Sequence, residues 1–185
     1  MSLHADALRS LTDWQPPDAD QERLRDRYVA HLRDHADGQE RGCFPTHLTA
    51  GTLVLDASLD RVLLNLHRKA GRWFAFGGHL EPGDRTLAGA ARREAREESG
   101  IADLEVDPEP LHLDQHAVDF CDPRGTVHHL DVRYGAVAPE GAAHAASEES
   151  LAVRWWPVSA LPDLEPEMHR LIGLARERFG TRQPG

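Results

Sequence analysis

Long apolar stretches are missing from this 185-residue sequence. No run approaches the roughly 18 apolar residues that a helix needs to cross a bilayer, which excludes a membrane-spanning helix. The first ten residues, MSLHADALRS, also lack the basic stretch followed by an apolar stretch that marks a secretory signal. We therefore expect a cytoplasmic protein that has no membrane partner.

Cysteine is scarce too, with 2 residues in the whole chain. Cys43 and Cys121 are far apart in the sequence and fit neither a CxxC pair nor a zinc-ligand pattern. Because no secretory signal is present, we expect both to be free thiols in a reducing cytoplasm.

An excess of positive charge is also lacking, because 21 Lys and Arg residues stand against 31 Asp and Glu residues, for a net charge of −10. Proteins that bind nucleic acid polymers neutralise phosphates with a basic face, so this balance disfavours such a partner. A small anionic ligand remains compatible, since a local arginine cluster or a bound cation can reverse the field at one site. The expected partner is a small molecule.

The pattern of apolar residues predicts an α/β (α+β) fold, in which helices cover both faces of a mixed sheet as an α/β/α sandwich. Helices are expected over residues 4–14, 21–35, 86–99 and 165–179, and strands over 48–55, 62–66, 73–76, 111–120, 127–137 and 153–156. We divide the chain into an N-terminal helical extension (1–45), one globular domain (46–180) and a short tail (181–185). The extension could cover the sheet, form the contact of a homodimer or act as a lid.

The predicted helix over 86–99 carries three glutamates where helix stability alone would not place them. Glu94, Glu97 and Glu98 lie in its last turn and a half. At this negative end of the helix dipole, each carboxylate costs roughly 0.3–1 kcal/mol. Glu94 and Glu98 are also like charges four residues apart, which is a further unfavourable spacing. These glutamates therefore call for another explanation.

The same glutamates continue the apolar side of the helix. One stripe, with steps of four, three, four and three residues, contains Leu87, Ala91, Glu94, Glu98 and Ile101. Partly buried carboxylates that repel each other need a compensating positive charge. A divalent cation meets that need, and oxygen ligands favour Mg²⁺ or Mn²⁺ over zinc. The competing interpretation is a solvated surface helix rich in charge.

The residues before this helix favour the metal site. A glycine-rich turn leads directly into the helix, and the range Gly77–Ile101 reads GGHLEPGDRTLAGAARREAREESGI. This range resembles the Nudix box, written G-x5-E-x7-REUxEExGU with U aliphatic. Gly78 matches the first glycine, and residues 93–101 match the second half, with Ala95 small for an aliphatic position. The resemblance covers roughly residues 46–179.

Two departures from the box concern its first glutamate. Asp84 stands at that position, and eight residues rather than seven separate it from Arg93. We place the additional residue in the loop before the helix, near Arg85 and Thr86, which leaves the spacing from Arg93 to Gly100 intact. Asp84 is then expected to bond the first helix amides or Arg93 and not to bind metal.

The resemblance implies a Mg²⁺-dependent hydrolase that cleaves the diphosphate linkage of a nucleoside diphosphate joined to another group. Glu94, Glu97 and Glu98 would hold one or more Mg²⁺ ions, or Mn²⁺, with the carbonyl of Gly78 as a further ligand. Diphosphates repel hydroxide, and such a metal cluster both neutralises their oxygens and activates water. Glu97, Glu98 and Arg93 would be the catalytic residues, with Arg93 orienting the glutamates.

Two regions of the sequence could supply the general base. One is Glu98 in the box. The other is Glu148 or Glu149, in the loop before the last predicted strand, where some Nudix members carry a catalytic glutamate. We favour Glu98, because the loop is generic in sequence and its glutamates fit simple solvation.

Four further side chains are candidates for substrate binding: Arg68, Arg72, His129 and Arg133. The first two precede the box, and the other two share a strand face. His128 and His129 are adjacent and should point to opposite faces of their strand. A second alternating set, formed by His112, Asp114 and His116, is interpreted as a polar sheet face that meets solvent.

Two other functions occur on the same scaffold. A ligand-sensing module would be indicated by the loss of a box glutamate, but all three are present. A prenyl-diphosphate isomerase would have a cysteine within Phe74–Gly78, and that segment has none. Hydrolysis is therefore the predicted function.

Overall fold

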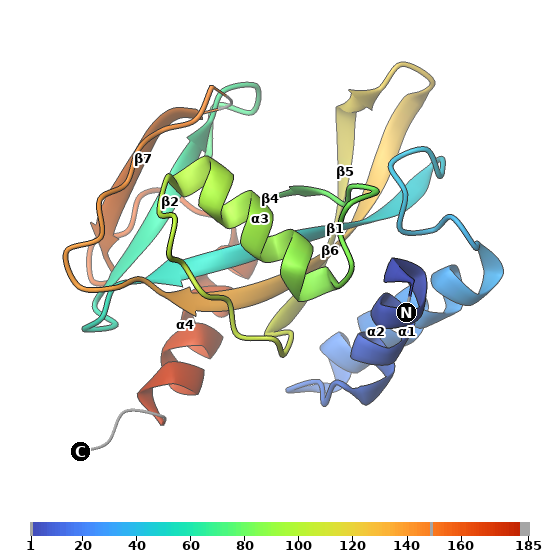
Figure 1. The fold of residues 1–185 in the computed structure, drawn as a ribbon, viewed down its shortest axis with the longest axis horizontal. Helices are drawn as coiled ribbons and strands as arrows, with labels where there is room; N and C mark the ends of the chain where they lie inside the picture. The colour runs from blue at the N-terminus through green and yellow to red at the C-terminus, as the bar shows by residue number, and fades with distance from the viewer. Residues whose placement is uncertain (1, 149, 182–185) are drawn as a thin grey trace.

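The computed structural model describes residues 2–148 and 150–181 (Figure 1). Its helices are α1 (Leu3–Asp13), α2 (Ala19–Asp34), α3 (Leu87–Ser99) and α4 (Pro166–Gly180). Its strands are β1 (Thr46–Leu55), β2 (Arg61–His67), β3 (Trp73–Phe74), β4 (Phe76–His79), β5 (His112–Asp122), β6 (Gly125–Val137) and β7 (Ser150–Pro157). The elements expected from the sequence are confirmed, except that the strand expected at 73–76 is divided between β3 and β4. No helix within the described ranges is long and apolar enough to cross a membrane.

The strands form one mixed sheet around β1. β1 runs parallel to β6, in a register that pairs Thr46 with His128 and Leu55 with Val137. The other strand pairs are antiparallel: β2 and β4 pair with β1, β5 pairs with β6, and β3 and β7 pair with β2. The central order β3-β2-β1-β6-β5 confirms the mixed sheet that the sequence predicted.

Helices cover both faces of this sheet, with α3 across one face and α4 on the other (Figure 1). Successive side chains of a strand point to opposite faces, so β1 contributes to both layers. Val54 packs in one buried cluster with Ala95 of α3. Leu53 and Leu55 pack in another cluster with Leu171 of α4. This layering confirms the expected α/β/α arrangement.

The N-terminal helices share a core with the rest of the chain. Leu11 of α1 and Tyr28 of α2 are fully buried and belong to one cluster with Leu87 of α3. The side-chain amide of Gln21 accepts a hydrogen bond from the N–H of Leu113 at 2.6 Å and donates to its carbonyl at 2.9 Å. Gln21 therefore bonds to β5 as a neighbouring strand would. Of the three roles left open for the extension, the structure shows it covering the sheet.

The interpretation of His112, Asp114 and His116 as a face that meets solvent was wrong for the first two residues, whereas the side chain of His116 is 41% exposed. The side chain of His112 is 0% exposed, and that of Asp114 is 16% exposed. Helix α2 lies over this part of β5, where the hydroxyl of Tyr28 donates to the carbonyl of Asp114 at 2.7 Å. The carboxylate of Asp114 accepts hydrogen bonds from His116 Nδ1 and Arg133 Nη2, each at 2.8 Å. Alternation within β5 could not reveal this covering helix, because α2 comes from a distant part of the chain.

Candidate active site

The glutamates of the box lie on α3, whose two ends are fixed by local interactions. The hydroxyl oxygen of Thr86 caps the helix by accepting from the N–H of Gly89 at 2.9 Å. Gly100 ends the helix with a φ of 72°, in the left-handed region that favours glycine. The helix runs from Leu87 to Ser99, and Asp84 to Thr86 precede it. The spacing of the glutamates within the helix is therefore undisturbed.

Glu98 is the most deeply placed of the three box glutamates, with an exposure of 6%. Its Oε2 accepts a hydrogen bond from the N–H of Gly77 at 2.9 Å. Its Oε1 lies 3.4 Å from the amide nitrogen of Asn65, which donates to it. These contacts hold the carboxylate against β4 and β2.

Glu94 lies directly against the backbone of Gly78. Its side chain is 15% exposed. A Cβ on Gly78 would lie 2.7 Å from Oε1 and 2.9 Å from Oε2 of Glu94, closer than real contacts allow. Gly78 itself is held by its pairing with Ala50 of β1. The absence of a side chain at position 78 therefore lets the Glu94 carboxylate approach the strand, and a Cβ there would displace it.

A cleft of ≈ 390 Å³ opens beside these groups. Its lining includes Glu94, Glu97, Glu98, Gly78 and Arg93. The side chain of Glu97 is 60% exposed, so it reaches further into solvent than the other two glutamates. The structure thus brings together on one surface all the residues that the sequence proposed for metal binding.

Arg93 joins the carboxylates around the cleft. Its Nε and Nη2 donate to the two oxygens of Asp84 at 3.1 and 2.9 Å, and Nη2 also donates to the carbonyl of His79 at 3.0 Å. Its Nη1 donates to Glu94 at 2.9 Å and to Glu97 at 3.3 Å. The hydrogen bond to Asp84 raises the pKa of Arg93 above its ordinary value, against the opposing effect of burial. Asp84 therefore bonds Arg93, which is one of the two arrangements expected for it.

The loop before β7 reaches the same cleft. Glu148 and Ser147 line it, whereas Glu149 lies outside the described residues. Arg68 donates from Nε to the carbonyl of Glu148 at 2.9 Å and from Nη2 to the carbonyl of Ser150 at 3.3 Å. Arg68 therefore holds the backbone of this loop.

Two other arginines proposed for substrate binding lie in ion pairs away from the cleft lining. Arg72 pairs with Glu165, at the start of α4. Arg133 is 8% exposed, and its guanidinium donates to Asp114 and Asp131, each at 2.8 Å. Their charges are thus engaged by carboxylates in this structure.

Two residues near the cleft, Arg41 and Asn65, were missed by the sequence interpretation. Arg41 lines the cleft although it comes from the segment assigned to the extension, and no sequence signal marks it. Asn65 had a signal, since it interrupts the apolar run at 62–66. His129, one of the predicted substrate-binding residues, lies next to the cleft residue His79. The centroids of their two rings are 5.1 Å apart.

A larger cavity of ≈ 480 Å³ lies between α2 and β5. Polar side chains line it, among them Arg27, Gln115 and Arg170, but the box glutamates do not. The three box glutamates gather beside Gly78 at the smaller cleft. We therefore assign the candidate active site to the smaller cleft and not to the larger cavity.

Comparison with known proteins finds a family match over most of the chain. A family model described as the NUDIX domain matches residues 45–174. The oxidized purine nucleoside triphosphate hydrolase of Danio rerio is 47% identical over 53 residues, which make up 27% of this chain and 33% of that protein. The chain thus spans about a third of the length of this curated relative.

Two solved structures are similar in fold. The Ap4A hydrolase of C. elegans is 17% identical, with a TM-score of 0.56, and the match covers 72% of this chain and 98% of that one. The dihydroneopterin triphosphate pyrophosphohydrolase of E. coli is also 17% identical with a TM-score of 0.56, over 74% and 96% of the two chains. At such low identity these likenesses show the fold alone.

Proposed function

The chain belongs to the NUDIX family of hydrolases, and from this membership we propose that it uses Mg²⁺ to cleave the diphosphate linkage of a nucleoside diphosphate joined to another group. The observation that carries this proposal is the convergence of Glu94, Glu97 and Glu98 on one cleft. They meet there beside Gly78 although helix stability disfavours carboxylates at that end of α3.

The donor set of the cleft fits Mg²⁺. Glu94, Glu97 and Glu98 offer carboxylate oxygens, and Gly78 admits the Glu94 carboxylate against its backbone, where the Gly78 carbonyl is a further oxygen donor. Hard oxygen ligands of this kind suit Mg²⁺, with Mn²⁺ as an alternative. When bound, the ion supplies positive charge against the diphosphate oxygens and makes water a better nucleophile.

The protein's own residues position the reaction. Arg93 holds Glu94 and Glu97 through one nitrogen and is itself held by Asp84 through two others. The N–H of Gly77 fixes the carboxylate of Glu98. Prepared in this way, the carboxylates need little rearrangement when substrate binds.

The reaction proposed is attack of a water oxygen on phosphorus. A new P–O bond forms, the bond from phosphorus to the bridging oxygen breaks, and the bridging oxygen leaves with the departing phosphate-containing product. A carboxylate must take the proton of the attacking water. We assign this proton to Glu98, whose orientation is fixed, and Glu148 at the rim of the cleft is the alternative acceptor.

The substrate class is proposed from charge and from the relatives' names. Arg41 and Arg93 line the cleft and place positive charge beside the carboxylates. The relatives are named for oxidized purine nucleoside triphosphates, Ap4A and dihydroneopterin triphosphate. We take from these names the shared class, a chain of phosphates on an organic group, and expect a nucleoside diphosphate derivative here.

Hydrolysis in ¹⁸O-labelled water tests this proposal. The protein is incubated with Mg²⁺ and a panel that contains ADP-ribose, a nucleoside triphosphate, a dinucleoside polyphosphate and a non-nucleotide diphosphate, and the products are analysed by mass spectrometry. We expect one member to be cleaved with the label in a phosphate group of the product, and Glu97→Gln to be inactive on it. Label in a non-phosphate position, or no cleavage of any member, would refute the proposal.

A further inference from the structure

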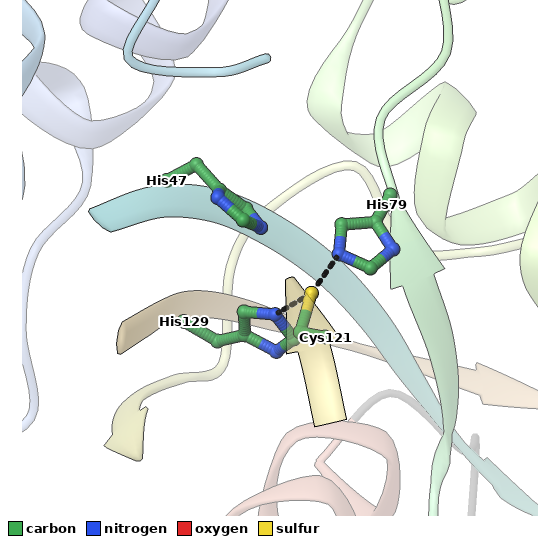
Figure 2. A group of neighbouring side chains, drawn as sticks. All are labelled: His47, His79, Cys121 and His129. Atoms are coloured by element: carbon green, nitrogen blue, oxygen red, sulfur yellow. Dashed lines mark hydrogen bonds between the residues drawn. The ribbon is translucent and has the colours of Figure 1, made fainter. Parts of the chain in front are cut away.

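Three histidines and a cysteine from four strands meet beside the cleft. Figure 2 shows His47 of β1, His79 of β4, Cys121 of β5 and His129 of β6 with their side chains turned toward a common centre. The Sγ of Cys121 lies 3.3 Å from Nε2 of His79 and 3.4 Å from Nε2 of His129. One ligand atom from each of the four residues lies within 4.8 Å of the other three.

His47 points an unpaired nitrogen at this centre. Its exposure is 1%, and its Nδ1 lies 3.1 Å from the carbonyl of Cys43. A carbonyl can only accept, so Nδ1 carries the proton and Nε2 is left with a lone pair. This buried Nε2 has no hydrogen-bond partner among the described residues. Metal-binding histidines are typically held in this way, with the second ring nitrogen donating to a backbone carbonyl.

The sheet holds the other imidazoles close to His47. In the parallel register of β1 and β6, His47 stands opposite His129, and their ring centroids are 5.0 Å apart. The ring of His79 lies 5.1 Å from each of the other two. The Nε2 atoms of His79 and His129 both face the Sγ of Cys121. The three rings and the thiol are therefore close enough to bind one ion.

We propose that His47, His79, Cys121 and His129 bind a divalent transition-metal ion, with Zn²⁺ the expected occupant. Imidazole and thiolate are the donors that zinc prefers, and they distinguish this site from the carboxylate site for Mg²⁺. Zinc bonds of about 2.1 Å to nitrogen and 2.3 Å to sulfur in a tetrahedron separate N from S by about 3.6 Å. The two N···S distances differ from that value by a few tenths of an ångström.

The ion would be structural, because four protein ligands complete its tetrahedron. It would tie the end of β5 and the start of β1 to β4, the strand that carries Gly77 and Gly78. His79 is also the residue whose carbonyl accepts from Arg93 at 3.0 Å. The zinc ion would therefore stabilise the position of β4, which lines the cleft, without contacting substrate. The sequence did not predict this site, because each ligand comes from a different strand and the four form no short motif.

Metal analysis of the purified protein tests the site directly. The 185-residue chain is purified without chelators from cells supplied with zinc, and its metals are measured by plasma mass spectrometry. Exchange with Co²⁺ then gives a spectrum, in which visible bands report tetrahedral coordination and a near-ultraviolet band reports a bond to thiolate. The variants are Cys121→Ser and His129→Gln, with Cys43→Ser and His128→Gln as matched controls that change the other thiol and the adjacent histidine.

We expect about one zinc per chain in the wild type and in both controls, with a thiolate band in the Co²⁺ form. Zinc affinity should fall by more than about 100-fold in Cys121→Ser and His129→Gln, because each removes a ligand, and loss of an outer-shell partner alone costs about 10- to 100-fold. Glu97→Gln should keep its zinc, which separates this site from the magnesium site. If the variants do not fold, the wild-type stoichiometry and its Co²⁺ spectrum still decide. Wild-type protein without bound metal and without a thiolate–cobalt band, or zinc retained by Cys121→Ser, would overturn the proposal.

Discussion

The carboxylate of Asp6 in α1 accepts a hydrogen bond from the backbone N–H of Leu87 in α3, at 3.0 Å. Asp6 is 3% exposed. It therefore places a buried carboxylate at the positive end of the helix that carries Glu94, Glu97 and Glu98. This contact joins the N-terminal extension to the start of α3.

Asp6→Ala should lower the free energy of unfolding by about 1–2 kcal/mol, because it removes the partner of a buried N–H at a helix start. Urea unfolding followed by circular dichroism measures the change. Asp13→Ala, at the exposed end of the same helix, is the control and should change stability by less than about 0.5 kcal/mol. Equal effects of the two substitutions would show that the contact with Leu87 contributes nothing specific.

Asp84→Asn should weaken Mg²⁺ activation more than it weakens folding. Asp84 holds Arg93 through two hydrogen bonds, and Arg93 in turn holds Glu94 and Glu97. Loss of such a supporting carboxylate typically costs about 10- to 100-fold in metal affinity or activity. The Mg²⁺ concentration for half-maximal activity should therefore rise by about 10-fold or more. An unchanged requirement for Mg²⁺ would mean that Asp84 does not support the site.

The box glutamates should matter more for catalysis than the glutamates of the loop. Glu97→Gln and Glu98→Gln each remove an anionic ligand or base, and kcat should fall by about 10²-fold or more. Glu148→Gln and Glu149→Gln, the matched variants in the loop, should each lower kcat by less than about 10-fold. If a loop variant is the most damaging of the four, the base lies in the loop and the assignment to Glu98 is wrong.

Asp114→Asn should lower the free energy of unfolding by about 3 kcal/mol near pH 6, because it removes one carboxylate from the buried Arg133. Burial raises the pKa of Asp114, but the hydrogen bond from His116 and the charge of Arg133 together lower it below 3.8. A lowered pKa means that its stabilisation is present above about 3.8 and is lost as pH falls through the folded value.

The partner His116 sets the upper limit of this pH window. Burial lowers the pKa of His116, while the hydrogen bond to Asp114 and nearby carboxylates outweigh it and raise the pKa above 6.5. Its stabilisation is therefore full below about 6.5 and is lost as pH rises through the folded value. Urea unfolding should show a larger effect of Asp114→Asn near pH 5.5 than near pH 8. The exposed Asp119→Asn is the control, and a penalty that does not depend on pH would contradict this account.

Local signals allowed much of the fold and of the site to be predicted. The glutamate stripe, the start of α3 near Thr86 and its end at Gly100 all depend on neighbours within a few residues, and each was expected from the sequence. The hydrogen bonds of Asp6 and Gln21 were not expected, because their partners lie on segments distant in the sequence. Sequence periodicity does not connect such segments. For the same reason the spacing of Cys121 gave no indication of a zinc ligand.

The Mg²⁺ dependence of turnover tests the central claim most directly. Metal is withheld by treating buffers with a chelating resin, which leaves tightly held zinc in place, and kcat is measured on the cleaved substrate before and after Mg²⁺ is added. Wild-type protein should be inactive without Mg²⁺ and active with Mg²⁺ or Mn²⁺, while Glu97→Gln and Glu98→Gln remain nearly inactive in both conditions. Full turnover without added divalent cation, or undiminished turnover by these variants, would contradict the claim that the α3 glutamates act through a bound metal ion.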